Sequence, residues 1–134
     1  MNKKLTFLLA YTLLFYFSGS VYANDLQDAA EAIRSKSYDK ALKLLIPLAR
    51  QGNSTAQYNL GVIYSNGDGV SQDYKEAIKW YRLAAEQEYP KAQFSLGSKY
   101  MQGQGVTEDL HEAIKWFRLA EENGFTDASV YIGL

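Results

Sequence analysis

The sequence repeats itself with a period of 36 residues, and this period limits the possible fold more than any other feature. Two segments align without a gap, and 18 of their 36 positions are identical: AQYNLGVIYSNGDGVSQDYKEAIKWYRLAAEQEYPK from Ala56 and AQFSLGSKYMQGQGVTEDLHEAIKWFRLAEENGFTD from Ala92. The same offset places ASVYIGL, from Ala128, at the start of a further copy, and SYDKALKLLIPLARQG on the second half of an earlier one. Such a period is typical of arrays in which each repeat packs only on its neighbours.

Each copy has the pattern of two helices joined by a glycine-containing turn. In the second helix, alanines and aromatic residues recur at i, i+3, i+4 and i+7, which places them on one helical face. We expect these residues in the core: Ala77, Trp80, Tyr81 and Ala84, and then Ala113, Trp116, Phe117 and Ala120. The pattern predicts helices at 25–34, 38–51, 54–66, 73–87, 90–102 and 109–123, with a stub from 127. The expected fold is therefore all-α.

The stretch SNGDGVSQD, Ser65 to Asp73, could be a cation loop, a phosphate cradle or a turn. Its copy is MQGQGVTED, in which the two glycines recur but Asp68 becomes Gln104. A phosphate cradle also wants a lysine after the glycines, and neither copy has one. What recurs is turn chemistry, since glycine takes positive φ at no steric cost. We therefore predict a turn between paired helices.

Other recurring residues have structural explanations. Asp73 and Asp109 each precede a glutamate by three residues at a helix start, which predicts an N-cap with a capping-box partner, Glu76 or Glu112. Glycine inside a helix costs about 1 kcal/mol relative to alanine, so its recurrence predicts a close contact where paired helices cross. The residues with expected structural roles are Gly61, Gly67, Gly69, Asp73, Ala77 and Trp80, and their counterparts Gly97, Gly103, Gly105, Asp109, Ala113 and Trp116.

The sequence has no recognisable catalytic or metal site. His111 is the only histidine and there is no cysteine, so a zinc site cannot be assembled from these two residue types. The serines lack a Gly-x-Ser-x-Gly elbow. We expect a protein that is not an enzyme and that needs neither a cofactor nor a metal.

The first 23 residues are predicted to be a secretory signal peptide. Lys3 and Lys4 precede an apolar run from Leu5 to Phe17, and small residues follow up to Ala23. The run is shorter than the ~20 residues of a membrane-spanning helix, so we expect cleavage after Ala23 and no membrane span afterwards; an uncleaved anchor is the alternative. Residues 24–134 carry 12 basic and 15 acidic side chains without a block of like charge. This balance argues against a nucleic-acid partner.

The motifs resemble those of the Sel-one-like repeat family, a relative of the tetratricopeptide repeat. The shared signature is Leu-Gly, Tyr, Gly-x-Gly-Val, Asp, Ala, Trp beside an aromatic, and Ala, as in LGVIYSNGDGVSQDYKEAIKWYRLAAE and LGSKYMQGQGVTEDLHEAIKWFRLAEE. The resemblance implies a right-handed α-α superhelix, or solenoid, of helix-turn-helix repeats over 24–134. Its units would be 25–55, which has a short loop, 56–91, 92–127 and a partial unit, 128–134.

Three positions depart from the pattern of the other units. Pro47 lies inside a predicted helix, where it removes a backbone hydrogen bond and should bend the helix. Glu88 stands where Gly52 and Gly124 end the other second helices, so this turn must close without glycine. Pro90 suits the first turn of the helix that follows.

The resemblance implies that the first helices line a concave groove. The groove positions are then Tyr58, Val62, Ser65, Asn66, Phe94, Ser98, Met101, Gln102 and, in the partial unit, Val130. Aromatic and small polar residues suit a peptide or protein partner, although Tyr58 and Phe94 could instead fill space between units. We expect an exported interaction scaffold or adaptor of the bacterial envelope, periplasmic or secreted. The alternatives are a cell-wall glycan binder that stacks sugars on Tyr58 and Phe94, and a repeat-fold hydrolase.

The apolar residues of the partial unit leave three explanations open. Repeat arrays usually finish in a helix with a polar outer face, whereas ASVYIGL is mostly apolar. The stub could pack back as a minimal cap, or form an edge for a partner or a second copy, or belong to a longer array that has been shortened.

Overall fold

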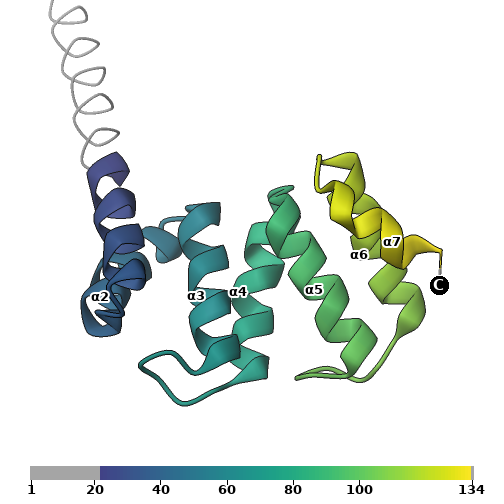
Figure 1. Cartoon of the computed structure of the whole chain (residues 1–134), viewed down its shortest axis with the longest axis horizontal. Coiled ribbons are helices and arrows are strands. Elements are labelled where there is room, and N and C mark those ends of the chain that lie inside the picture. Colours follow the sequence, from purple (N-terminus) through teal and green to yellow (C-terminus); the bar gives the residue numbers. More distant parts are fainter. Residues whose placement is uncertain (1–21, 134) are drawn as a thin grey trace, which may run out of the picture. The chain divides into compact units, whose positions relative to one another are not determined.

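A computed structural model of the chain describes residues 22–133 (Figure 1). Apart from Tyr22 and Ala23, the predicted signal peptide lies outside this range. All regular elements between 22 and 133 are helices. None of these helices has both the length and the apolar character that crossing a bilayer requires. The predicted all-α fold, a repeat superhelix, is confirmed.

The described chain divides into two compact parts, one ending at Leu44 and the other beginning at Leu45. In the first part, a helix at 22–34 is followed by the start of α2 (Tyr38–Arg50). The link between them turns at Lys36, whose φ of 58° is left-handed although the residue is not glycine. As predicted, α2 continues through Pro47.

The second part contains the complete repeat units. Its elements after α2 are α3 (Ser54–Asn66), α4 (Tyr74–Glu86), α5 (Pro90–Gln102), α6 (Leu110–Glu122), the 3-10 turn η1 (Thr126–Ala128) and α7 (Ser129–Ile132). Each helix packs on the next along the chain, α3 on α4, α4 on α5, α5 on α6 and α6 on α7 (Figure 1). The α4–α5 turn closes at Glu88 with φ 61°, so this turn indeed dispenses with glycine, and Pro90 begins α5.

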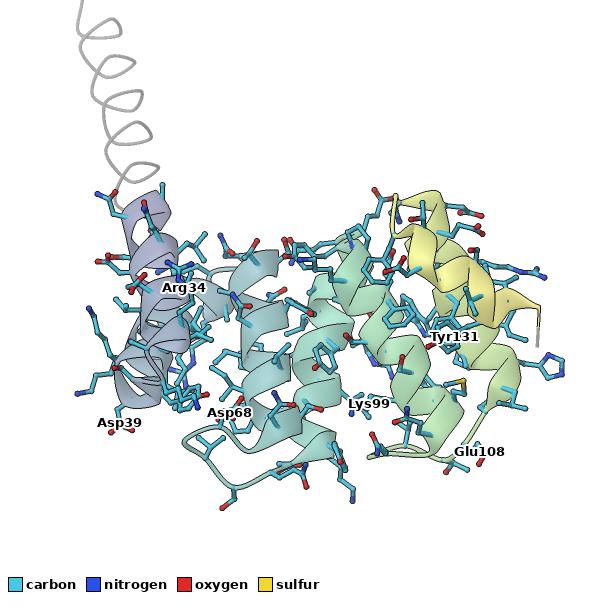
Figure 2. The ribbon with its side chains drawn as sticks, viewed as in Figure 1. Arg34, Asp39, Asp68, Lys99, Glu108 and Tyr131 are labelled. Carbon is cyan, nitrogen blue, oxygen red and sulfur yellow. The ribbon has the colours of Figure 1, made fainter. Side chains whose placement is uncertain are left out.

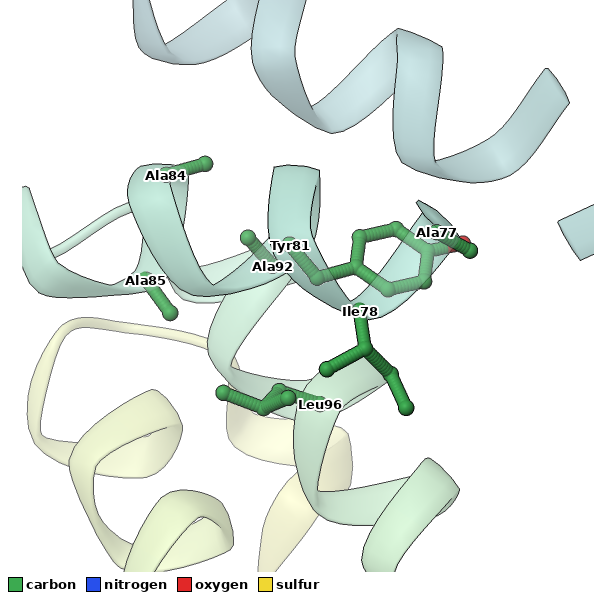
Figure 3. Packing of buried hydrophobic residues seen from close by; sticks show 7 residues of the cluster. All are labelled: Ala77, Ile78, Tyr81, Ala84, Ala85, Ala92 and Leu96. Carbon is green, nitrogen blue, oxygen red and sulfur yellow. The ribbon is translucent and has the colours of Figure 1, made fainter. Parts of the chain in front are cut away.

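The core of this part consists of small residues around a few large ones. One cluster, between α4 and α5, combines four alanines with three larger apolar residues (Figure 3): Ala77, Ile78, Tyr81, Ala84, Ala85, Ala92 and Leu96. A second cluster joins α6 to η1 through Ala113, Phe117, Ala120 and Ala128. The prediction that Trp80 and Trp116 belong to the core is only partly right, because both side chains are partly exposed. Each precedes the buried aromatic by one residue, about 100° around the helix, and so lies at the edge of the buried face.

The helix glycines make the predicted close contacts, and the partner in each case is an aromatic ring of the second helix. A Cβ on Gly61 would lie 2.5 Å from two ring carbons of Tyr81. A Cβ on Gly97 would lie 2.8 Å from the Phe117 ring and 3.1 Å from the carbonyl oxygen of Ala113. The two ring distances are shorter than real Cβ contacts, so the paired helices can approach this closely only where the first helix has no side chain.

Two buried glutamines, not predicted from the sequence, join neighbouring units. Gln57 Nε2 donates to the carbonyl of Ala49 and Gln93 Nε2 to that of Ala85, each over 3.1 Å. The side-chain oxygen of Gln93 accepts from Asn123, and that of Gln57 from the Gln87 amide. These bonds connect the first helix of each unit to the end of the preceding unit's second helix, and also to the end of the second helix in the same unit. The two glutamines stand 36 residues apart, and this recurrence was the only sign of their role in the sequence.

The turn between paired helices is built as predicted, with one correction. Gly67 and Gly103 end the first helices with φ of 74° and 63°. Asp73 accepts from the backbone N–H of Glu76, and Asp109 from that of Glu112. The reciprocal half of the capping box is not formed. The N–H of Asp73 donates to the carbonyl of Tyr64 and that of Asp109 to Tyr100, while each glutamate pairs with a lysine three residues on. The backbone N–H of each Asp is thus bonded to the first helix of its unit, which holds the turn against that helix.

We expect Asp109→Ala to lower the free energy of unfolding by about 1 kcal/mol, because the Glu112 N–H loses its acceptor at the start of α6. Asp109→Asn should retain most of the stability, since the Asn side-chain oxygen can accept the same bond. Urea denaturation followed by circular dichroism measures both variants. Equal losses for alanine and asparagine would contradict the capping role.

Candidate binding surface

The predicted groove residues lie on one side of α3 and α5. Along α3 they recur at i, i+4, i+7 and i+8, and along α5 they repeat that spacing. Within each helix, the last of the four is the most exposed: Asn66 on α3 and Gln102 on α5. Val62, Ser98 and Met101 are partly buried, and Ser65 is buried. Each complete unit therefore presents an exposed side-chain amide beside partly covered apolar and hydroxyl groups.

Tyr58 belongs to an aromatic cluster of the protein itself. Its ring centroid lies 5.3 Å from that of Tyr89 and 5.9 Å from that of Tyr81. Burial raises the pKa of Tyr58, and hydrogen bonding with the Ser95 hydroxyl opposes this shift. Burial likewise raises the pKa of Tyr81 to about 12, opposed by hydrogen bonding with Ser65. Both phenols are therefore neutral at ordinary pH. Through its contact with Tyr89, the N-cap residue of α5, Tyr58 connects α3 to α5.

Phe94 has the same role in the next unit, where its ring lies 4.7 Å from Phe125, 5.3 Å from Phe117 and 5.5 Å from Tyr131, between ring centroids. Figure 2 shows Tyr131 among the side chains of this region. These contacts favour the alternative in which Tyr58 and Phe94 fill space inside the array. They also leave the two rings poorly placed as stacking platforms for sugars.

Val130, the third residue of this series, differs from its counterparts. Its side chain is 76% exposed, and it lies on α7, which spans only Ser129–Ile132. The structure therefore does not join Val130 to the aromatic clusters that contain Tyr58 and Phe94.

Lys99, which has no recognisable role from the sequence alone, lies between two units. Its ammonium is 4.3 Å from the ring centroid of Tyr74 and donates to the side-chain oxygen of Gln104 over 2.8 Å. Burial lowers the pKa of Lys99. A comparison of the two units could have pointed to Lys99, because its counterpart in the preceding unit is an apolar residue, the buried Ile63. A lysine at this position exchanges apolar packing for a cation–π contact with the preceding unit.

The charged side chains do not form a site with evident chemistry. Across residues 22–133, no three His, Asp or Glu side chains are grouped to hold a metal ion. His111 is exposed on α6. Asp68, the acid that first suggested a cation loop, accepts from the side-chain amide of Asn66 over 3.1 Å. The surface offers apolar contact and neutral hydrogen-bonding groups, which suit recognition of another molecule.

Comparison with known proteins identifies the repeat. The Sel1 repeat family model matches residues 7–53, 54–89 and 90–125. A Sel1 repeat protein from Oxalobacter formigenes has 36% identity and a TM-score of 0.76, over 80% of this chain and 44% of that protein. The c5321 protein, a protective antigen present in uropathogenic Escherichia coli strains that displays this repeat fold, has 47% identity and a TM-score of 0.62, over 63% of this chain and 18% of that one.

Cysteine-rich protein B of Helicobacter pylori shares the fold at 22% identity, with a TM-score of 0.66, over 78% of this chain and 94% of that one. No curated protein matches the sequence. The chain spans less than half the length of the Oxalobacter and E. coli proteins.

Proposed function

The chain belongs to the Sel1 repeat family, whose members are protein–protein interaction scaffolds, and from this premise we propose that it is an exported, non-enzymatic adaptor of the bacterial envelope. Its partner is a protein or peptide bound along the face of α3 and α5. Since a fold alone does not fix a function, the proposal depends on the residues of that face.

The observation that carries the proposal is the recurrence of one exposed amide per unit at the same register. Asn66 and Gln102 are 36 residues apart. One turn before them lie the partly buried Val62 and Ser98, and the partly buried Met101 directly precedes Gln102. Two amides at the same register can hydrogen-bond the backbone of an extended or helical segment, while the partly buried side chains beside them supply apolar contact. The aromatic clusters beneath hold the first helices at a fixed spacing.

Export is supported by the amino-terminal sequence, in which Lys3 and Lys4, an apolar run and Ala23 form the layout of a signal peptide. The protective-antigen character of the E. coli relative is in keeping with a location outside the cytoplasm. A chain without cysteine can fold in an oxidising compartment without the risk of mispaired disulfides.

We expect the double variant Asn66→Arg, Gln102→Arg to weaken partner binding at least about tenfold, because two long cations would replace the exposed amides. The partner is first captured from an envelope extract by the unaltered chain and identified, and its affinity for each variant is then measured by calorimetry. Both positions are exposed, so the stability of the variant should change by less than about 0.5 kcal/mol.

The matched control is Leu83→Arg with Leu119→Arg. These residues are also exposed and 36 residues apart, but they lie on the second helices. The control adds the same charge and should bind the partner as the unaltered chain does. Equal weakening by both double variants would show a charge effect rather than a groove on the first helices.

A further inference from the structure

Charged side chains are distributed unevenly between the first and second helices. From residue 54 onward, every Asp and Glu lies on a second helix, in a turn or on η1. α3 carries no charged side chain, and α5 carries only Lys91 and Lys99. The face that α3 and α5 present to a partner therefore contains no carboxylate, although the formal net charge of the chain is −1.

Lys91 lies on the exposed side of α5. Ser95, Ser98 and Gln102 follow it at i+4, i+7 and i+11, a spacing that places all four residues on one side of the helix. Lys91 and Gln102 are exposed, and the two serines are partly buried. The other lysine of this helix, Lys99, lies over an aromatic ring of α4 instead. Lys91 is thus the cation that α5 presents to a partner, among neutral hydrogen-bonding groups.

The corresponding side of α3 is neutral. Its residues at the same register are Thr55, Asn59, Val62 and Asn66. The two helices adjoin near their amino-terminal ends, where the ring centroid of Tyr58 on α3 lies 5.3 Å from that of Tyr89, the N-cap residue of α5. Tyr89 precedes Lys91 by two residues, so this lysine stands at the end of α5 that adjoins α3. A peptide that crosses from α3 to α5 there would meet neutral groups and a positive charge.

Lys91 has no carboxylate partner within the described chain. The ion pairs of residues 22–133 join residues three positions apart on one helix, and none of them includes Lys91. Asp127, the counterpart of Lys91 in the partial unit, is exposed and forms no ion pair with it. The charge of Lys91 is therefore available to a partner. A carboxylate is the group that gives an ammonium its strong, charge-assisted hydrogen bonds.

Building on the proposed function, we propose that the peptide bound on the face of α3 and α5 places the side-chain carboxylate of an Asp or Glu against Lys91, so that this face selects acidic segments. Opposite charge speeds association and favours one register, and like charge excludes basic segments. Gln102 lies eleven residues beyond Lys91, roughly 16 Å along α5 at ~1.5 Å per residue. The exposed amides therefore contact a different part of the peptide from the lysine.

The test selects random peptides displayed on phage, in parallel on the unaltered chain, on Lys91→Glu and on Lys75→Glu. Glutamate suits the first turn of α5, so Lys91→Glu should fold as the unaltered chain does. Lys75 is also exposed but lies on α4, so its variant makes the same charge change away from the face. We expect one peptide position rich in Asp and Glu after selection on the unaltered chain and on Lys75→Glu, and rich in Lys and Arg after selection on Lys91→Glu.

A selected acidic peptide, labelled with a fluorophore, is then titrated with each chain and followed by fluorescence anisotropy. Lys91→Glu should weaken its binding at least about tenfold, because two like charges would face each other. Lys91→Arg and Lys75→Glu should leave the binding unchanged. Replacing the acid of the peptide by lysine should restore binding to Lys91→Glu, a result that a merely structural role of Lys91 would not produce.

Selected peptides without a preferred acid would overturn the proposal, and so would equal binding of the acidic peptide by the unaltered chain and by Lys91→Glu. Equal weakening by Lys91→Glu and Lys75→Glu would show a general effect of net charge and would also overturn it. If peptides without an acid bind and Asn66→Arg with Gln102→Arg weakens them, the proposed function stands and only the role of Lys91 fails. If no peptide is selected on any of the three chains, both fail.

Discussion

Replacing Phe117 by alanine is expected to lower the free energy of unfolding by about 3–5 kcal/mol. The ring is buried, and its centroid lies 5.3 Å from that of Phe94 and 5.1 Å from that of Tyr131. Its loss leaves a cavity between Phe94 and Tyr131, where the packing of α5, α6 and α7 is joined. Urea denaturation followed by circular dichroism gives the change.

The control for Phe117→Ala uses the other unit of the repeat. The counterpart of Phe117 is Tyr81, which is likewise buried. Tyr81→Phe keeps the ring that packs against Gly61 and should change the free energy of unfolding by less than about 1.5 kcal/mol, as size-conserving core substitutions do. A loss below about 1 kcal/mol for Phe117→Ala would contradict the assignment of this ring to the core.

The helices could be predicted from the sequence because the signals that start, fill and end a helix lie within the helix itself or beside it, and because each signal occurs in both complete units. The apolar spacing, the Asp caps and the glycine turns recur after 36 residues, so chance agreement at one position is tested at the other. The bounds of α3 and α5 agree with the prediction, and α4 and α6 each start one residue later and end one residue earlier than expected. The family was recognisable for the same reason.

What could not be predicted is how far each side chain is covered by neighbours. Helical periodicity placed Trp80 with the buried residues, but burial depends on what the next unit sets against the edge of that face. Similarly, the register of Tyr58 and Phe94 on their helices predicts a place in the groove. It does not predict that the rings of Tyr89, Phe125 and Tyr131 occupy the space beside them. The buried glutamines were missed because polar residues are normally expected outside. The candidate site was thus predictable as a face of two helices, and the distribution of exposed groups on it was not.

The double variant Gly61→Ala, Gly97→Ala is expected to lower the free energy of unfolding by up to about 4 kcal/mol, although alanine favours a helix by about 1 kcal/mol per site. Each new methyl group would meet a buried ring, at 2.5 Å for Tyr81 and 2.8 Å for Phe117. Forcing an extra methyl group into a packed core typically costs about 1–3 kcal/mol. The two sites have different aromatic partners, so their effects should add.

Gly133 supplies the internal control because it stands at the same position of the partial unit. No atom lies within 4 Å of its Cβ position, and its φ of −78° is accessible to alanine. Gly133→Ala should therefore change stability by less than about 0.5 kcal/mol. The difference between Gly133 and the two helix glycines, measured in one background by urea denaturation, compares a site with open space at the Cβ position with two sites that face a ring. If Gly61→Ala and Gly97→Ala stabilise the chain, helix propensity governs these positions and the close approach of the paired helices does not require glycine.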